Sequence, residues 1–314
     1  MIKPKVYIKD GKIRIDPEIE RKLRNAQYGV WGHSTVEICH WTKKALKKEG
    51  VCYKRKFFGI ETHRCMEFSP AGVFCQNRCI YCWRPSEFYS ILKMDESMVD
   101  DPKEIVEHLM EERRKLLSGF GGNEKVDKQL FKESLNPSHF AISLSGEPTM
   151  YPKIDVLVKE YKKHGMITFL VTNGMQPERL LRINADQLYI SFESYNRKLY
   201  ERLNVPLYKD GWERLMKSLR YFRDNRSKRR VMRITLIKDW NMKAEKFKEF
   251  IDIAEPDFIE TKAYMYIGYS RERMKFENMP THREVVSFSK ELSDITGYRI
   301  KDEEPKSRVV LLER

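Results

Sequence analysis

The chain has 314 residues, a formal net charge of +14 and six cysteines. Hydrophobic residues make up 41% of it and aromatic residues 12%, which is enough for a packed core and excludes an intrinsically disordered protein. The length allows one large domain or two ordinary ones. An excess of positive charge of this size suits a polyanionic partner such as a nucleic acid.

The N-terminal residues do not have the composition of a targeting signal. They alternate lysine with valine, isoleucine and tyrosine and contain no apolar stretch of the kind that a secretory signal peptide needs. No apolar run reaches the length of about 18 residues that a membrane-spanning helix needs, so we expect a cytoplasmic protein without a membrane span. In that reducing compartment, clustered cysteines are more often metal ligands than disulfide partners.

Residues 1–66 are expected to form an N-terminal extension. A β-hairpin is predicted over Lys5–Ile8 and Lys12–Ile15, turning at Asp10-Gly11, and a helix follows over Pro17–Asn25.

A second helix of this extension is predicted from about Thr35 to Lys48. Ser34 or Thr35 is expected to be its N-cap, and Gly50 lies just past its end.

Residues 67–265 are expected to form the core domain, in which short apolar strands alternate with amphipathic helices. The predicted strands are Met66–Phe74, Phe140–Leu144, Ile167–Thr172, Leu188–Phe192, Val231–Ile237 and Phe258–Ala263. The predicted helices are Pro102–Leu117, Pro152–His164, Trp212–Asp224 and Ala244–Ala254. This alternation is typical of a parallel sheet covered by helices, so the pattern indicates an α/β fold with a partial or complete barrel, or else a doubly wound open sheet.

Two further segments complete the predicted organisation. Residues 118–137 interrupt the alternation and are expected to be an insertion. Residues 266–314 are expected to form a C-terminal extension, with one more helix from about Thr281 and a charged strand over Ser307–Leu312.

The most specific motif is the C-x3-C-x2-C run formed by Cys75, Cys79 and Cys82, which directly follows the first predicted core strand. Thiolates are the preferred ligands of iron–sulfur clusters and of zinc. Three of them on one short loop can hold three irons of a [4Fe–4S] cluster and leave the fourth iron open, as a catalytic centre requires. The alternative is a zinc knuckle, which would need a fourth cysteine or histidine at finger-like spacing.

The run resembles the signature of the radical S-adenosylmethionine (SAM) enzymes, including the aromatic Tyr81 before the last cysteine. The resemblance implies that SAM chelates the open iron and is cleaved to a 5′-deoxyadenosyl radical. Ser145-Gly146-Glu147-Pro148, at the end of the second core strand, is similar to the turn that binds the SAM amino group in that superfamily. Asn173 and Thr235 lie where barrel active sites are built, so we also assign them to the SAM pocket; the alternative is that they are ordinary turn and core residues.

The other cysteines, Cys39, Cys52 and Cys65, are thirteen residues apart and fit no zinc-finger spacing. Three thiolates without an evident fourth ligand suggest a second cluster that also has an open iron. The segment between Cys39 and Met66 holds eight Lys or Arg residues and two Glu, and this charge would help to balance an anionic cluster. Two alternatives remain: buried structural thiols, or a closed site in which His40 or His63 is the fourth ligand.

The two cysteine sets together make the chain similar to the archaeal tRNA 4-demethylwyosine synthases over most of its length. The resemblance implies an incomplete (βα)6 TIM-like radical SAM barrel with N-terminal and C-terminal extensions and two [4Fe–4S] clusters. It also implies a reaction in which N1-methylguanosine beside the anticodon of phenylalanine tRNA (position 37) is condensed with two carbons of pyruvate to give 4-demethylwyosine. An external one-electron reductant is implied as well, and we expect a monomer.

Lys54 matches the position of the lysine that forms a Schiff base with pyruvate in that family. A lysine amine can attack a keto acid in this way when a neighbouring cation or desolvation lowers its pKa. The alternative for Lys54 is one more phosphate-facing charge. Three basic runs are candidates for contact with tRNA phosphates, namely Lys43–Lys56, Arg226–Arg230 and Arg271–Lys275.

Two other classes of function remain open. One is a radical SAM enzyme with another substrate, such as an activase that acts on a protein. The other is a non-catalytic, zinc-stabilised RNA-binding protein, which the Ser145–Pro148 turn and the C-x3-C spacing disfavour.

Overall fold

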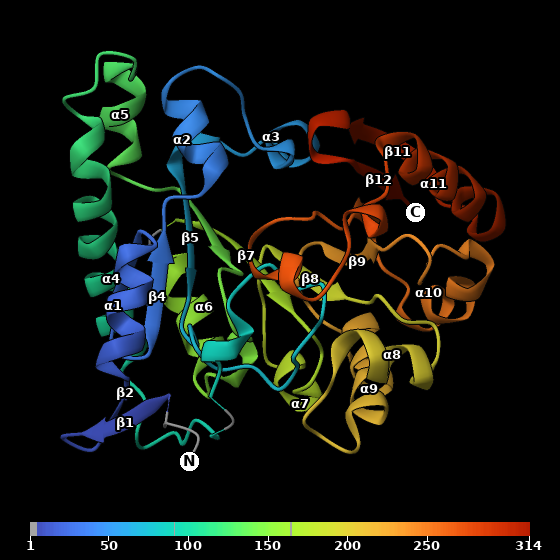
Figure 1. Ribbon diagram of the computed structural model, residues 1–314, viewed down its shortest axis with the longest axis horizontal. Helices are drawn as coiled ribbons and strands as arrows, with labels where there is room; N and C mark the ends of the chain where they lie inside the picture. Colours follow the sequence, from blue (N-terminus) through green and yellow to red (C-terminus); the bar gives the residue numbers. More distant parts are fainter. Residues whose placement is uncertain (1–4, 91, 164) are drawn as a thin grey trace. The chain divides into compact units, whose positions relative to one another are not determined.

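The computed structural model of the chain describes residues 5–90, 92–163 and 165–314 (Figure 1). The chain divides into two compact units. The first contains Met1–Cys75 and Phe88–Leu170, and the second contains Gln76–Glu87 and Val171–Arg314. The sequence suggests different boundaries, at residues 66 and 265, which mark the two ends of the expected barrel. These boundaries stay a prediction.

The first unit contains the strand order β3-β4-β5-β6-β7. These strands are β3 Tyr28–Trp31, β4 Ser34–Glu37, β5 Cys65–Ser69, β6 His139–Ile142 and β7 Ile167–Thr172. β5, β6 and β7 are parallel, whereas β3 and β4 extend the sheet in antiparallel fashion. The first three strands of the predicted core are therefore confirmed.

A separate hairpin joins β1 Val6–Lys9 to β2 Lys12–Ile15, as predicted. Asp10 and Gly11 both have positive φ, at 50° and 71°, which is the backbone of a tight two-residue turn.

The helices of the first unit flank its sheet. They are α1 Pro17–Asn25, α2 His40–Leu46, α3 Tyr53–Phe58, α4 Pro102–Leu117, α5 Lys128–Ser134 and α6 Ile154–Lys163. α1 and α4 pack against β3, and α4 also packs against β4 and α6 (Figure 1). The predicted bounds of α1 and α4 are confirmed, and α5 lies in the predicted insertion. The predicted end of α6, His164, lies outside the described residues.

The predicted helix from Thr35 to Lys48 is wrong in its first half. Residues 34–37 form strand β4, which pairs with β3 and β5, and the helix begins only at His40 with Cys39 as its N-cap. Pairing with two neighbouring strands outweighs the weak helical periodicity of this segment. Strand β5 is also shorter than predicted, because Pro70 has no N–H group with which to continue the ladder.

The second unit contains the strand order β8-β9-β10-β12-β11. These strands are β8 Gln187–Ser191, β9 Arg230–Leu236, β10 Phe258–Ala263, β11 Arg299–Glu304 and β12 Val309–Glu313. β8, β9 and β10 are parallel, whereas β12 and β11 are antiparallel additions at the side of β10. The sequence predicted the three parallel strands and β12 but missed β11, which has a mostly charged sequence.

The helices of the second unit are α7 Pro177–Leu180, α8 Arg197–Asn204, α9 Gly211–Arg223, α10 Lys248–Ala254 and α11 His282–Thr296. α9 packs against α7 and α10, and α11 packs against β10 and β12. Short 3-10 turns in the chain include η1 Thr62–Arg64, η2 Ser86–Phe88, η3 Ser118–Phe120, η4 Pro148–Met150, η5 Ala244–Phe247, η6 Gly268–Glu272, η7 Phe276–Asn278 and η8 Pro305–Ser307.

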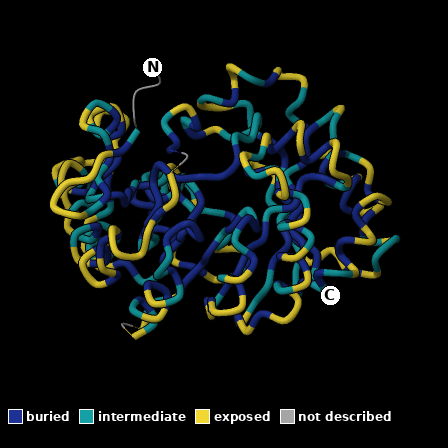
Figure 2. The backbone as a smooth tube through the Cα atoms, turned by 90° about the horizontal axis from the view of Figure 1, so that it is seen from below, coloured by how far each residue is buried: buried dark blue, intermediate teal, exposed yellow. Residues whose placement is uncertain are grey.

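Burial follows the layers. The parallel strands are mostly buried along their length, with every residue of β6 and four of the five residues of β8 buried. Exposed backbone lies mainly on the outside of the molecule (Figure 2). Sheets covered by helices have strands with this apolar character. Among the described residues, no helix has the length and hydropathy needed to cross a bilayer.

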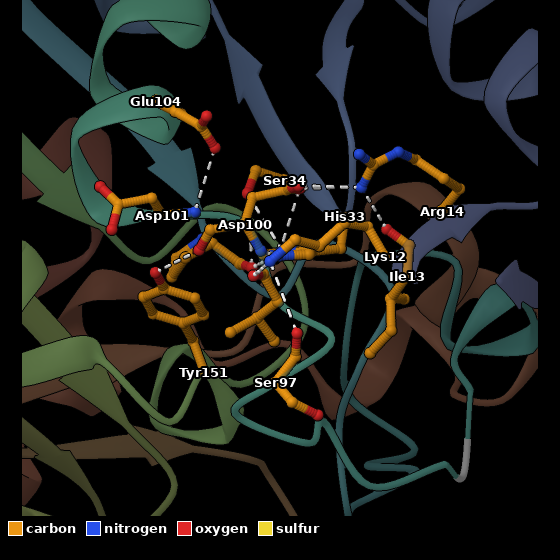
Figure 3. Close-up of polar contacts among 12 residues, drawn as sticks. Lys12, Ile13, Arg14, His33, Ser34, Ser97, Asp100, Asp101, Glu104 and Tyr151 are labelled. Carbon is orange, nitrogen blue, oxygen red and sulfur yellow. Dashed lines mark hydrogen bonds and ion pairs between the residues drawn. The ribbon is translucent and has the colours of Figure 1, made fainter. Parts of the chain in front are cut away.

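A buried histidine joins three segments of the first unit (Figure 3). Nδ1 of His33 donates to the carbonyl oxygen of Pro70 at 2.6 Å, and Nε2 accepts from the backbone N–H of Asp100 at 2.9 Å. The Asp100 carboxylate binds Nη1 of Arg14 at 2.9 Å, and a Cβ at Gly32 would collide with that carboxylate. These bonds require the neutral tautomer of His33 and fix the backbone at Pro70, just before the Cys75 loop.

Burial lowers the pKa of His33 to about 4, although the neighbouring Asp100 carboxylate opposes this shift. Arg14 and Lys12 lower the pKa further. In the unfolded chain an ordinary histidine has a pKa near 6.5. Between these two values the unfolded chain binds a proton at this position and the folded chain does not, so the free energy of unfolding falls as the pH falls from 6.5 towards 4.

We predict that His33→Gln weakens this part of the pH dependence. Between pH 6.5 and pH 5, His33 should reduce the free energy of unfolding of the wild type by about 2 kcal/mol. The variant should have a lower free energy of unfolding than the wild type at neutral pH. At pH 5 the difference between the two proteins should be smaller by about 2 kcal/mol. Anaerobic urea unfolding at both pH values measures this, and a gap of constant size would contradict the assignment.

Candidate active site

The Ser-Gly-Glu-Pro turn, residues 145–148, packs against the segment that leads into Cys75. Gly146 has φ +66°, and a Cβ there would collide with the carbonyl oxygens of Ala71 and Phe74. Only glycine allows so close an approach of two backbones in this conformation. The turn and the start of the cysteine loop are therefore held as one piece of structure in the first unit.

Glu147 is 2% exposed, and its carboxylate is held in a fixed orientation. Its Oε1 accepts hydrogen bonds from the N–H and the hydroxyl of Thr149, at 3.0 Å and 2.5 Å. Its own N–H donates to the carbonyl oxygen of Phe74 at 2.6 Å. A buried, oriented carboxylate at the end of a parallel strand suits a cationic ligand group.

In the second unit, the cysteine loop is held by the C-terminal end of α8. The N–H groups of Arg78 and Ile80 donate to the carbonyl oxygens of Asn204 and Leu203, at 3.0 Å and 2.9 Å. The last carbonyl groups of a helix have no partner within the helix. Here the cysteine loop supplies that partner, and the loop residues around Cys79 gain a rigid support.

Tyr81 and Thr235 are brought together by a residue that sequence reasoning missed. Glu193, which follows β8, is 4% exposed and accepts a hydrogen bond from the Thr235 hydroxyl at 3.1 Å. Burial raises the pKa of Glu193 to about 7, against the opposing effect of hydrogen bonds from Tyr81 and Thr235 and of the Arg233 charge. A carboxyl group with a shifted pKa at a strand end is a common feature of active sites, and its position two residues after β8 is the signal that could have found it.

Asn173 has at least one structural role. Its Oδ1 accepts a hydrogen bond from the N–H of Met175 at 3.0 Å, within the turn after β7 where Gly174 has φ +76°. This contact matches the alternative in which Asn173 is a turn residue, and its assignment to the SAM pocket stays a prediction.

The second cysteine set lies in the first unit, on three different segments. Cys39 is the N-cap of α2, Cys52 that of α3, and Cys65 begins β5. Hydroxyl groups fix two of these residues, because the Cys39 sulfur contacts Oγ1 of Thr42 at 3.3 Å and the Cys52 N–H donates to Oγ1 of Thr62 at 3.1 Å.

The three thiol groups lie close enough to affect one another. Burial raises the pKa of Cys39 to about 12, and the nearby Glu67 and Cys52 contribute to the shift. Burial, Cys39 and Cys52 raise the pKa of Cys65 in the same way, whereas Lys54 lowers it. Cys39 and Cys65 are therefore neutral thiols when nothing is bound, and a bound metal would supply the positive charge that deprotonates them.

Lys54 points into the first unit rather than towards solvent. Its Nζ lies 5.3 Å from the ring centroid of Phe169 on β7 and interacts with the Cys65 thiol. This position disfavours the alternative in which Lys54 is a phosphate-facing surface charge.

A second cation beside these thiols was not predicted. Arg113 on α4 is 1% exposed; its guanidinium donates to the carbonyl oxygens of Cys65, at 3.2 Å, and of Ser134. Burial lowers the pKa of Arg113 to about 10, and the charges of Cys65 and Cys39 oppose this shift. The sequence did contain a signal, because Arg113 falls in the row Ile105, Leu109, Arg113, Leu117, which is otherwise apolar at helical spacing.

The histidines proposed as a fourth ligand have other surroundings. Nε2 of His63 contacts the Glu133 carboxylate at 2.7 Å, and His40 packs edge-on against Trp41. Among the described residues, no three His, Cys, Asp or Glu side chains converge on the position of a single metal ion. A cubane cluster binds each thiolate through a different iron, so its ligands need not converge in this way. None of the six cysteines, all of which are described, forms a disulfide.

Several residues of the basic runs have internal partners, among them Lys48, which pairs with Asp127 at 2.6 Å. Arg230 forms an ion pair with Asp257 at 2.8 Å, and Arg273 pairs with Glu87 at 3.0 Å and donates to the carbonyl oxygen of Cys82. These two arginines stabilise the second unit and its cysteine loop, so we withdraw them from the predicted tRNA surface.

Two family models match the chain. The radical SAM superfamily model covers residues 69–251, and a model described as wyosine base formation covers residues 253–314. The first of these spans more than half of the chain, and with it the predicted α/β radical SAM fold is confirmed.

Relatives and solved structures match almost the whole chain. SAM-dependent tRNA 4-demethylwyosine synthases of Pyrococcus horikoshii and Methanocaldococcus jannaschii are 43% and 38% identical, over 98% and 95% of this chain and 94% and 96% of theirs. A structure of TYW1 with a lysine-pyruvate adduct bound has a TM-score of 0.87 at 37% identity, and one of archaeal TYW1 has 0.79 at 33%; each covers 95% of this chain and 96% of the other. The chain therefore belongs to the radical SAM tRNA 4-demethylwyosine synthases of the wyosine pathway.

Proposed function

We propose that the chain condenses N1-methylguanosine beside the anticodon of phenylalanine tRNA with two carbons of pyruvate, giving 4-demethylwyosine. The observation that carries this proposal is the position of Lys54, whose amino group lies beside the Cys65 thiol and against Phe169. A keto acid needs such a nucleophilic amine, whereas a radical SAM activase that acts on a protein does not. The relative solved with a lysine-pyruvate adduct supports the same assignment.

We infer that Lys54 binds pyruvate covalently. Its amine attacks the keto carbon, and loss of one water gives an imine, so that no oxidant or reductant is consumed in this step. The surroundings suit this role, because the half-buried Lys54 places its amino group in the first unit, 5.3 Å from the Phe169 ring centroid and beside the Cys65 thiol.

The residues near Cys75, Cys79 and Cys82 fit a [4Fe–4S] cluster and SAM. When bound, these two groups supply the radical that removes a hydrogen atom from the N-methyl group of the guanine. Glu147 would hold the SAM amino group, and Gly146 keeps the backbone of its turn close enough to the cysteine loop for this. Tyr81, Glu193 and Thr235 form the hydrogen-bonded group that would line the pocket in the second unit.

We further propose a second [4Fe–4S] cluster on Cys39, Cys52 and Cys65. The donor set fits, because three half-buried thiols lie close together and next to two cations, Lys54 and Arg113. These cations would offset part of the negative charge that the thiolates and cluster bring into a low-dielectric site.

The tRNA would lie against the N-terminal extension of the first unit. Arg55 and Lys56 are exposed there. Arg55 and His63 also border a hollow of about 440 Å³, together with Lys48, whose amino group is already paired with Asp127 at 2.6 Å. Basic residues of this kind bind phosphates without reading the base sequence. We propose that the protein is cytoplasmic, because that compartment keeps thiols reduced. We also propose that it is a monomer and that it receives electrons from an external one-electron reductant.

The decisive experiment is anaerobic incubation of the iron-loaded chain with SAM, pyruvate, a reductant and tRNA that contains N1-methylguanosine. Mass analysis of the nucleosides should show 4-demethylwyosine, with two carbons from labelled pyruvate. Two cubane clusters predict about eight irons per chain. A colourless zinc protein without product would remove the proposal in favour of the RNA-binding alternative.

Replacement of Lys54 should abolish the covalent step alone. Lys54→Arg retains a positive charge but cannot form an imine. We therefore expect full iron loading and SAM cleavage, but a rate of product formation at least a hundredfold lower, which corresponds to a barrier higher by about 3 kcal/mol. Cyanoborohydride in the presence of pyruvate should modify the Lys54 peptide of the wild type and leave the variant unmodified. Product at the wild-type rate in Lys54→Arg would refute this role.

Replacement of Arg113 should affect the second cluster selectively. Arg113→Met keeps an unbranched side chain of similar length but removes the charge and the bond to the Cys65 carbonyl, so we expect about half of the iron to be lost while the SAM-responsive cluster remains. Iron analysis and electron paramagnetic resonance (EPR) with and without SAM measure this.

The neighbouring residue provides a matched control for that prediction. Arg114 is exposed on the other side of α4, so Arg114→Met removes the same charge one residue away. It should retain all of the iron. Equal iron content in the two variants would show that Arg113 does not support the cluster.

A further inference from the structure

We propose that Asn204 is a positioning residue for the SAM-binding cluster. Asn204 holds the sulfur of Cys79 and, through an N–H···S hydrogen bond, raises the reduction potential of the cluster. Asn204 is the last residue of α8 and is 6% exposed. Its Nδ2 lies 3.6 Å from Sγ of Cys79 and 3.1 Å from the hydroxyl oxygen of Tyr81. The residue is far from the cysteine motif in sequence, and its role follows only from the packing of α8.

The amide of Asn204 is fixed in the orientation that this role requires. The Ser194 hydroxyl donates to Oδ1 at 3.3 Å, so the carbonyl side of the amide is occupied and the NH2 group faces Cys79. The backbone is fixed as well, because the Asn204 carbonyl accepts from Arg78 and the next residue, Val205, has φ +41°. A donor held on both sides loses little further freedom when it binds a sulfur.

The physical effect on a bound cluster follows from charge. A thiolate ligand carries more negative charge when the cluster is reduced, and a hydrogen-bond donor stabilises that charge. Hydrogen bonds to the sulfurs are one of the factors that set cluster potentials, and the effect is larger in a buried site of low dielectric constant. Asn204 should therefore make the cluster easier to reduce, and reduction must precede SAM cleavage.

The same amide links the cluster loop to the pocket residues. The Tyr81 oxygen accepts from Asn204, and its own hydrogen is available for the Glu193 carboxylate, with which it forms a hydrogen bond. Cys79, Asn204, Tyr81 and Glu193 thus form one chain of hydrogen bonds within the second unit. Of these four hydrogen-bonded residues, only Cys79 and Tyr81 belong to the cysteine motif.

The test is a redox titration of the anaerobically loaded full chain. The SAM-responsive cluster is identified as the EPR signal that changes when SAM is added. In Asn204→Leu, which keeps the size but removes the donor, the ratio of reduced to oxidised cluster at the wild-type midpoint should fall about tenfold, which equals about 59 mV for one electron. Asn204→Asp replaces the donor by an acceptor with negative charge and should lower the ratio further.

A matched control separates the contact from the substitution. Asn196 is the N-cap of the same helix, and Asn196→Asp adds the same charge at the opposite end while preserving the cap. The ratio of reduced to oxidised cluster in Asn196→Asp should equal that of the wild type. These measurements need neither tRNA nor pyruvate, so they are independent of the proposed condensation.

Each remaining outcome decides the question. Wild-type ratios in both Asn204 variants would overturn the proposal. Loss of only the SAM-responsive signal in both, with the circular dichroism of the wild type, would support the positioning of Cys79, whereas loss of the signal together with loss of the folded spectrum would overturn it in favour of a general folding role. If Asn204→Leu alone fails to load, Asn204→Asp gives the answer.

Discussion

The close approach of three half-buried thiols is the constraint on which the first unit depends. Cys39, Cys52 and Cys65 come from three separate segments, and burial together with their mutual proximity raises the pKa values of Cys39 and Cys65. A cluster bound there would bring negative charge into a region with little access to water. The cations Lys54 and Arg113 are arranged around this region, one from the cysteine segment itself and one from helix α4.

Lys54 and Arg113 answer that constraint in different ways. Arg113 is fully enclosed and bound to two backbone carbonyl groups, so it is a permanent part of the framework. Lys54 lies against Phe169 and beside the Cys65 thiol. A guanidinium that is fixed by its hydrogen bonds can balance the charge of a cluster, whereas a primary amine can attack a keto carbon. The division of roles therefore follows from the chemistry and the anchoring of each cation rather than from its charge.

The cysteine loop and the segment before it are held largely through their own backbone groups in both units. In the first unit, Gly146 lets the turn after β6 approach the carbonyl groups of Ala71 and Phe74, and His33 holds Pro70 from the other side. In the second unit, the end of α8 accepts the N–H groups of the loop. A loop fixed through its backbone leaves its side chains available for ligands, which is the pre-organisation that a catalytic centre needs.

The sequence by itself determined the fold class, most core strands and the two cysteine sets, because these depend on short-range patterns. Strand and helix periods are local, and the members of each cysteine set follow one another at regular spacing in the sequence, so spacing is enough to group them. The failures have one physical origin. Residues 34–37 became a strand because β3 and β5 lie on either side, and Arg113, Glu193 and Asn204 gained their roles from neighbours far away in the chain. Only the tertiary structure decides which distant groups share a buried space, because burial and its electrostatic consequences are properties of the packed molecule and not of any segment of it.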